Sequence, residues 1–193
     1  HGSGRRSVEQ NDRGISVVLS VIEGRSVKPY DRGAGIMRHI VSILVENKFG
    51  VLARIAGLFS ARGYNIASLA VSETLDPTIS YITMVVEAED EKILEQIKKQ
   101  LNKLIDVIIV TDFTKKGHVD RELILAKVGY SSKDKSKLDE VLNKAGAKAI
   151  QRLDDAAIIE MMGNQDDIRE LLDGLKQFGI KELVRSGRIA ISK

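Results

Sequence analysis

Residues 40–66 read IVSILVENKFGVLARIAGLFSARGYNI and contain the change of pattern that decides the fold. Residues 40–45 are apolar and rich in β-branched side chains, which predicts a buried strand. Residues 47–50 are typical of a turn. Apolar residues then recur at helical spacing, and Gly63 lies where a glycine in the left-handed conformation would end a helix. The helix face consists of Val51, Leu52, Ile55, Leu58 and Phe59.

The residues that follow extend this strand–turn–helix unit. Residues 66–73 and 80–87 predict two strands joined by the turn at residues 75–78, and therefore a hairpin. Asp90 is a suitable N-cap for a second helix, and residues 107–110 predict a buried strand after it. The order is βαββαβ. The apolar face of the second helix is formed by Ile93, Leu94, Ile97, Leu101 and Leu104.

The second half of the chain repeats the order of elements without repeating the sequence. Residues 123–128 predict a strand, and a helix is expected to start near Asp134. Residues 148–153 and 156–162 are expected to pair as a hairpin. A second βαββ arrangement follows from this pattern.

A second helix and a final strand complete the repeat. Asn164, with Asp167 three residues later, predicts a capped helix start, and Gly179 is expected beyond the helix end. Residues 182–191 predict the last strand. We therefore expect an α+β protein with two tandem ferredoxin-like βαββαβ domains, whose antiparallel sheets carry helices on one face. The face of the second helix is formed by Ile168, Leu171, Leu172, Leu175 and Phe178.

The pattern also suggests where the parts begin and end. Residues 1–36 are glycine-rich, start with the tag-like HGSG and lack a sustained helical period, so we interpret them as a poorly structured leader or tag before Met37. Residues 15–22 retain the potential to form a strand. The first folded domain is expected over residues 37–114 and the second over residues 115–193.

Composition narrows the range of functions. The 193 residues are 43% hydrophobic, carry a formal net charge of +3 and include no cysteine. No apolar run approaches the roughly 18 residues needed to cross a bilayer, so we expect no membrane interaction of that kind. Without cysteine there are no disulfides or thiolate metal sites, which favours a cytoplasmic location. Basic residues alternate with acidic ones along the chain, so nucleic acid is not an expected partner.

A search for catalytic groups finds no convincing set. Among modules of this order, RNA binders carry aromatic residues on the third strand, where this chain has only Tyr81, and copper chaperones need paired cysteines. His39 and His118 are the only imidazoles beyond the tag, and we interpret both as surface residues. Acidic pairs at residues 154–155 and 166–167 suit turns and helix caps. No nucleotide-binding motif is present, so we expect no catalytic residue, metal site or cofactor site.

One candidate binding site remains, at residues 46–52. The first N–H groups of the following helix lack partners within the helix, and Gly50 permits a ligand to approach the backbone closely. Such a site suits a carboxylate. The alternative is that Asn47 and Gly50 only form the turn, and the local pattern by itself favours that alternative.

A longer comparison of motifs favours the binding site. The stretch Glu46-Asn47, followed by residues 50–66, closely resembles the ACT domain of acetolactate synthase small subunits. The resemblance covers the chain from Met37 to Lys193 and is strongest in the first domain. It continues through residues 76–80, 94–107, 121–123 and, more loosely, 185–187.

The resemblance implies a regulatory subunit rather than an enzyme. It implies a homodimer through ACT domains that binds valine, or a related branched-chain amino acid, between subunits. Thiamine diphosphate, Mg²⁺ and FAD would belong to a separate large catalytic subunit, which this chain would activate and make sensitive to feedback. The implied ligand-binding residues are the turn and helix start of one subunit and a position from its partner, namely Asn47, Gly50, Val51, Leu52, Asn65 and Ile66.

Two other functions remain open at this level. A free-standing ACT-type sensor would control another enzyme or a transcription regulator. A small enzyme on a ferredoxin-like scaffold is also compatible with the order of elements, because that scaffold serves many functions. Co-purification with a large thiamine-diphosphate protein would distinguish the regulatory subunit from both.

Overall fold

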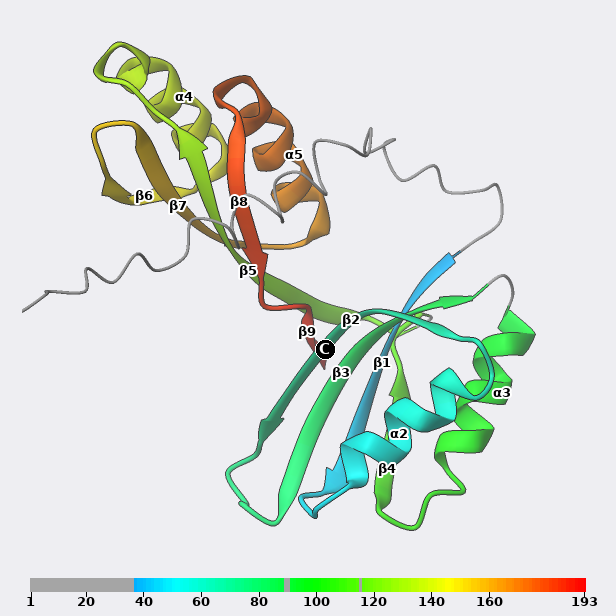
Figure 1. Cartoon of the computed structure of the whole chain (residues 1–193). Helices are drawn as coiled ribbons and strands as arrows, with labels where there is room; N and C mark the ends of the chain where they lie inside the picture. The colour runs from blue at the N-terminus through cyan, green and yellow to red at the C-terminus, as the bar shows by residue number, and fades with distance from the viewer. Residues whose placement is uncertain (1–36, 89–90, 115) are drawn as a thin grey trace, which may run out of the picture. The chain divides into compact units, whose positions relative to one another are not determined.

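The computed structural model describes residues 37–88, 91–114 and 116–193 (Figure 1). The described residues belong to one compact unit. It contains two antiparallel sheets, each with two α-helices, which confirms the expected α+β fold of tandem ferredoxin-like domains. The predicted leader, the potential strand at residues 15–22 and the predicted Asp90 cap lie outside the described residues.

The first sheet has the strand order β2-β3-β1-β4, in which sequence neighbours β1 and β2 are separated by β3. All its pairings are antiparallel. Helices α2 and α3 lie on the same face of this sheet (Figure 1). The elements are β1 (Met37–Glu46), α2 (Val51–Ser60), β2 (Asn65–Glu73), β3 (Ile79–Ala88), α3 (Glu91–Leu101) and β4 (Val107–Asp112).

Alternating residues of the central strands form the first core together with the two helices. Val41, Ile43 and Val45 point from β1 toward the helix face, since side chains two apart share one side of a strand. Their helical partners follow the predicted spacing. Those buried partners are Val51, Ile55, Phe59, Leu94, Ile97 and Leu101.

The second sheet repeats this topology with the order β6-β7-β5-β8. Asn164 caps α5 as predicted. Its Oδ1 accepts from the Asp166 and Asp167 N–H groups at 2.8 and 3.0 Å, and the Asn164 N–H donates to Asp167 Oδ2 at 3.1 Å. The elements are β5 (His118–Gly129), α4 (Lys135–Ala145), β6 (Lys148–Arg152), β7 (Ala156–Gly163), α5 (Gln165–Leu175), β8 (Ile180–Arg185) and β9 (Ile189–Ser192), with short 3-10 turns at Ser132–Asp134 and Lys176–Phe178.

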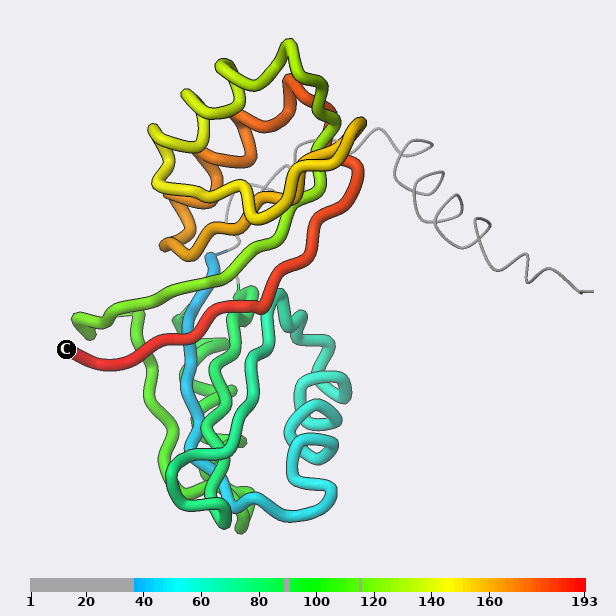
Figure 2. The backbone as a smooth tube through the Cα atoms, turned by 90° about the vertical axis from the view of Figure 1, so that its left-hand side faces the viewer, coloured from blue at the N-terminus to red at the C-terminus, as the bar shows by residue number. Residues whose placement is uncertain are grey.

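The prediction of one final strand was wrong. The chain leaves the sheet after β8, turns at Gly187 with φ +80°, and continues as β9. Strand β9 pairs with the first four residues of β5, from His118 to Arg121 (Figure 2). β5 therefore starts five residues before the predicted position. The polar first half of β5 was interpreted as a connection. Only the second half contributes to the core of the second domain, through Ile124, Ala126 and Val128.

The ribbon formed by β9 and the start of β5 covers part of the open face of the first sheet. Ala190 of β9 is buried with Ile40, Val85 and Phe113. The Tyr81 hydroxyl donates to the Ala190 carbonyl oxygen at 3.1 Å. The first sheet thus packs helices on one face and part of this ribbon on the other.

The interpretation of His39 as a surface residue was wrong, because His39 is buried. The other histidine, His118, is partly exposed. β1 begins at Met37 rather than Ile40, so His39 belongs to a central strand and is 2% exposed. Its Nδ1 lies 2.9 Å from Thr114 Oγ1, and its Nε2 has no hydrogen-bond partner among the described residues.

Among the described residues, no helix has the length and apolar character needed to cross a membrane.

Candidate ligand-binding site

The turn between β1 and α2 is held in a defined conformation. Gly50 has φ +81° and occupies the N-cap position, where a left-handed residue starts the helix. Asn47 is tied to the neighbouring turn between β2 and β3, because its backbone N–H donates to the Thr78 carbonyl at 2.7 Å and its Nδ2 donates to the Pro77 carbonyl at 2.9 Å. The predicted turn is therefore present, and Asn47 helps to build it.

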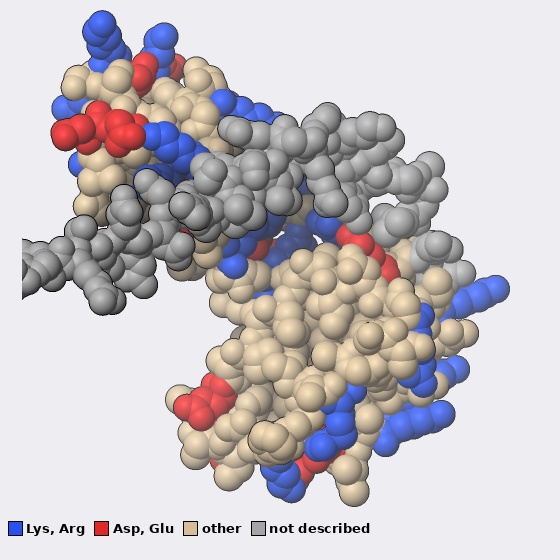
Figure 3. Space-filling model, in the orientation of Figure 1, with Lys and Arg blue, Asp and Glu red and all other residues tan. Residues whose placement is uncertain are grey.

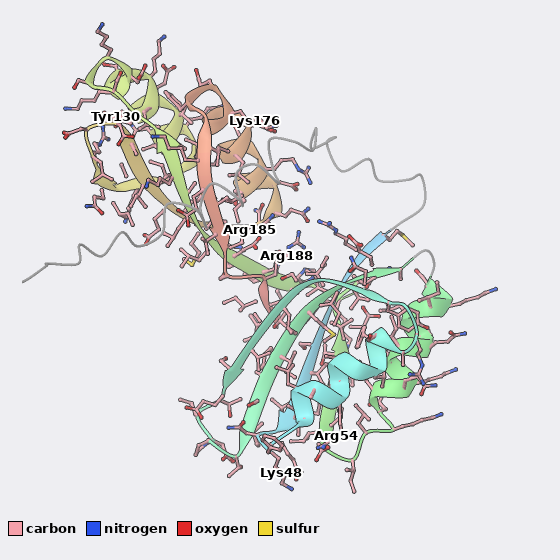
Figure 4. The ribbon with its side chains drawn as sticks, in the orientation of Figure 1. Lys48, Arg54, Tyr130, Lys176, Arg185 and Arg188 are labelled. Atoms are coloured by element: carbon pink, nitrogen blue, oxygen red, sulfur yellow. The ribbon has the colours of Figure 1, made fainter. Side chains whose placement is uncertain are left out.

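Basic side chains gather at this helix start. Arg54 donates from Nε and Nη2 to Asp106 Oδ2 at 3.1 and 2.6 Å, and its guanidinium also lies over Gly50. Lys48 pairs with Glu46 at 2.7 Å, and this hydrogen bond raises the pKa of Lys48. The first turn of α2 has no acidic residue, so the positive end of the helix dipole is not offset there. Figure 4 shows Lys48 and Arg54 at this end of the first domain, and Figure 3 shows basic side chains (blue) together with acidic ones (red) there.

Sequence reasoning included Lys48 in the candidate stretch at residues 46–52 without giving it a role, and it did not assign Arg54 to the site. A signal was available for Arg54, because it follows Gly50 by four residues and positions i and i+4 lie on the same side of a helix. For Lys48 the sequence offered no comparable signal, since its direction depends on the fold of the turn.

Val51 and Leu52, the first two residues of α2, serve different purposes. The Val51 side chain is buried in the first core, and its N–H lies 3.3 Å from the Lys48 carbonyl oxygen, so it is not a fully available donor. The Leu52 side chain is 41% exposed. Leu52 thus presents apolar surface beside the turn, where a small aliphatic side chain of a ligand can pack.

The structure does not bring Asn65 and Ile66 to the turn of the same chain. Asn65 pairs with Glu87 near one end of β3, whereas Glu46, next to the turn, pairs with Ile79 at the other end. Those two β3 residues are eight positions apart, which is roughly 26 Å in a strand. Asn65 Nδ2 instead donates to Glu87 Oε2 at 2.6 Å. The six predicted ligand-binding residues therefore form two separate groups within one chain.

No group of three histidine, cysteine, aspartate or glutamate side chains suited to a metal ion occurs among the residues that the structure describes. The turn site offers a helix start, an exposed leucine and two cations, each of which also pairs with a carboxylate of the chain. These groups are suited to binding a small carboxylate. The βαββαβ topology is that of a ferredoxin-like domain of the ACT class.

Comparison with known proteins identifies the family. Residues 41–109 match the model of the AHAS small subunit-like ACT domain, and residues 121–193 match the model of the small subunit of acetolactate synthase. The chain belongs to the family of acetolactate synthase small subunits.

Individual relatives agree with this assignment. A probable acetolactate synthase small subunit of Archaeoglobus fulgidus is 44% identical over 155 residues, covering 80% of this chain and 96% of the relative. The acetolactate synthase small subunit of Bacillus subtilis is 39% identical over 157 residues, covering 81% and 91%. The crystal structure of the acetolactate synthase small subunit from Thermotoga maritima matches with a TM-score of 0.73 and 34% identity, covering 81% of this chain and 98% of that one.

Proposed function

We propose that this chain forms a homodimer that activates a large catalytic subunit of acetolactate synthase and transmits feedback inhibition by valine bound between two ACT domains. The catalytic cofactors, thiamine diphosphate with Mg²⁺ and FAD, then belong to the large subunit. The observation that carries the proposal is the separation of Asn65 from the Asn47–Gly50 turn within one chain. Two copies are needed to complete the site.

Pairing of two copies through β2 provides the required geometry. β2 is an edge strand, so its outward N–H and C=O groups beyond the contact with Gly187 are available to another strand. In a two-fold antiparallel pair, Asn65 at the start of one β2 lies beside Glu73 at the end of the other. That end of the sheet carries the turn of the partner copy, which brings Asn65 to the side of the site that the turn leaves open.

Apolar side chains at the same edge support this pairing. Leu69 and Val71 pair with Met84 and Ile82, which belong to the helix-covered core, so all four share that face. Leu69 and Val71 are nevertheless 37% and 43% exposed, because they extend beyond the cover of the chain's own helices. Burying them between two copies removes apolar surface from water.

The chemistry of the proposed site suits an aliphatic amino acid. The carboxylate of valine would lie at the start of α2, where the helix dipole favours a negative charge. It would lie near Lys48 and beside Arg54 Nη1, the Arg54 nitrogen that faces Gly50 while Nε and Nη2 donate to Asp106. The ammonium group would meet the Asn47 side-chain oxygen and the partner's Asn65 side chain. The branched side chain would pack on Leu52.

Feedback follows if valine favours one arrangement of the dimer over another. The ligand contacts both copies, so it stabilises only those arrangements in which the turn of one copy and Asn65 of the other are close. The large subunit would be less active when it is bound to the dimer in that arrangement. A coupling free energy of about 1–3 kcal/mol is typical of such regulation.

Co-purification tests the assembly that this function requires. We expect the tagged chain, co-expressed with its cognate large subunit, to retain that subunit through affinity and size-exclusion chromatography. The chain purified alone should produce no acetolactate from pyruvate. Separation of the two proteins at micromolar concentration would favour a free-standing amino-acid sensor, and turnover by the chain alone would exclude a purely regulatory role.

A further inference from the structure

The turn between β8 and β9 is fixed against strand β2. Gly187 lies so close to β2 that an added Cβ would be 2.9 Å from Ser68 Oγ and 3.2 Å from the Leu69 carbonyl oxygen. The next residue, Arg188, donates its backbone N–H to Ser68 Oγ at 3.0 Å. The contact occurs at an irregularity in β2, after Ile66. Arg188 is therefore held at a defined position by its backbone, independently of its side chain.

The Arg188 side chain is nearly buried and has only a long ion pair as its anionic contact. The side chain is 11% exposed, and Asp120 Oδ2 lies 3.8 Å from Nη1, which is an ion pair beyond hydrogen-bond distance. Across the described part of the chain, no hydrogen bond from this guanidinium is found. Burial lowers the pKa of Arg188, and the attraction of Asp120 and Glu122 opposes that effect. The N–H groups of its guanidinium therefore remain available to a ligand.

Two further arginines lie nearby, and each already has a carboxylate partner. Arg185 donates from Nε and Nη2 to the two oxygens of Glu122 at 2.9 and 2.5 Å. Arg38 donates from Nε and Nη2 to Glu87 Oε1 at 3.1 and 3.0 Å. Both arginines repel Arg188, which contributes to the lowering of its pKa. Of the three, Arg188 is the one whose carboxylate partner is not within hydrogen-bond distance.

The three arginines line one cavity of about 280 Å³. Ser68 also lines it, and its hydroxyl accepts the Arg188 N–H, which leaves the hydroxyl hydrogen to donate to a ligand. A neighbouring cavity of about 420 Å³ also includes Arg38 and Arg188. Arg185 and Arg188 are labelled at the end of β8 and in the turn before β9 (Figure 4).

We propose that this cavity binds a phosphate group, with the Arg188 guanidinium as the principal donor. A planar guanidinium binds phosphate through two parallel N–H···O bonds. Donors from Arg188, Arg185 and Ser68 approach the cavity from two segments of the chain, which suits the oxygens of a tetrahedral anion better than the two coplanar oxygens of a carboxylate. The ligand supplies the hydrogen-bond acceptors that the Arg188 guanidinium lacks among the described residues.

Isothermal titration with inorganic phosphate, in a phosphate-free buffer at constant ionic strength, tests this site. We expect one phosphate per chain with a Kd of about 1 mM or below, as for two charge-assisted hydrogen bonds. Arg188→Gln should weaken binding by at least about tenfold. Arg188→Lys keeps the charge but loses the planar pair of donors, so binding should weaken several-fold. Arg62→Gln is the control, because Arg62 is an exposed arginine that lines neither cavity, and binding should not change.

Additional ligands define the chemistry of the anion. Acetate at the same ionic strength should not displace phosphate. Tighter binding of glycerol phosphate than of inorganic phosphate would support a phosphate ester that extends into the larger cavity, and the reverse order would support the free ion. Far-UV circular dichroism checks that each variant is folded. If Arg188→Gln is unfolded, the binding measured with Arg188→Lys tests the role of Arg188. Absence of phosphate binding by the wild-type chain, unchanged binding by a folded Arg188 variant, or preference for acetate would overturn the proposal.

Discussion

Gly50→Asp is expected to remove valine feedback while leaving activation of the large subunit intact. The new carboxylate would lie beside the proposed position of the valine carboxylate. Two like charges about 4 Å apart repel by about 1 kcal/mol in water and about 4 kcal/mol at an effective dielectric near 20. Valine affinity should therefore fall by a factor that lies between several-fold and nearly a thousandfold. An assay of the reconstituted enzyme across a valine titration measures this shift.

The structure adds a second reason for the loss. A Cβ at position 50 would lie 3.4 Å from Arg54 Nη1, so the Asp carboxylate would pair with the cation that we assign to valine. Folding should survive, since Asp tolerates positive φ better than most residues and an acid suits a helix start.

Gly50→Asn is the matched control, because it adds a side chain of nearly the same shape without the charge. Valine inhibition should weaken less in this variant. Unchanged inhibition in the Asp variant would place the valine site elsewhere, and equal losses in both variants would attribute the effect to shape rather than charge.

Val71→Pro is expected to convert the proposed dimer into a monomer. Thr74 N–H donates to the Ile79 carbonyl, so in the alternation of an antiparallel pair the N–H of Val71 points away from β3. Proline removes that outward donor in both copies without breaking a bond inside the sheet, and edge strands tolerate it. Two lost hydrogen bonds and the added ring should weaken dimerisation roughly a hundredfold or more.

Light scattering measures this change as a fall from twice the 21.3 kDa chain mass to the single mass. Val71→Thr, which retains the N–H and the β-branched shape, is the control and should remain dimeric. Valine binding should disappear with the dimer, because the partner's Asn65 is then absent. A Val71→Pro protein that is folded, dimeric and able to bind valine would exclude β2 as the interface.

The sequence contained enough information for the cores and for the turn site. Periodic residues such as Val51, Ile55 and Phe59 carry the helical pattern directly, and a local motif placed Gly50 at the start of α2. Strand β9 was not predicted as a separate element, because its pairing with β5 depends on a contact between residues about 70 positions apart. The apolar pattern of residues 182–191 is short and is interrupted at Gly187. It does not reveal that the chain leaves the second sheet after β8 and then pairs with the start of β5.

The same limit applies to individual side chains. His39 was misassigned because its burial depends on two neighbouring strands and on Thr114, 75 residues away. Arg188 received no role, since its proximity to Ser68 and Arg38 exists only in the folded chain. Local periodicity thus predicts elements well, whereas charges brought together by long-range contacts require the structure.

Acetolactate formation by the separately purified large subunit, with and without this chain, is the most direct test of the regulatory role. The account predicts that a stoichiometric amount of the chain raises the rate and that added valine lowers the rate again, whereas valine has little effect on the large subunit alone. An unchanged rate on addition of the folded chain, or valine inhibition that does not depend on it, would contradict the account.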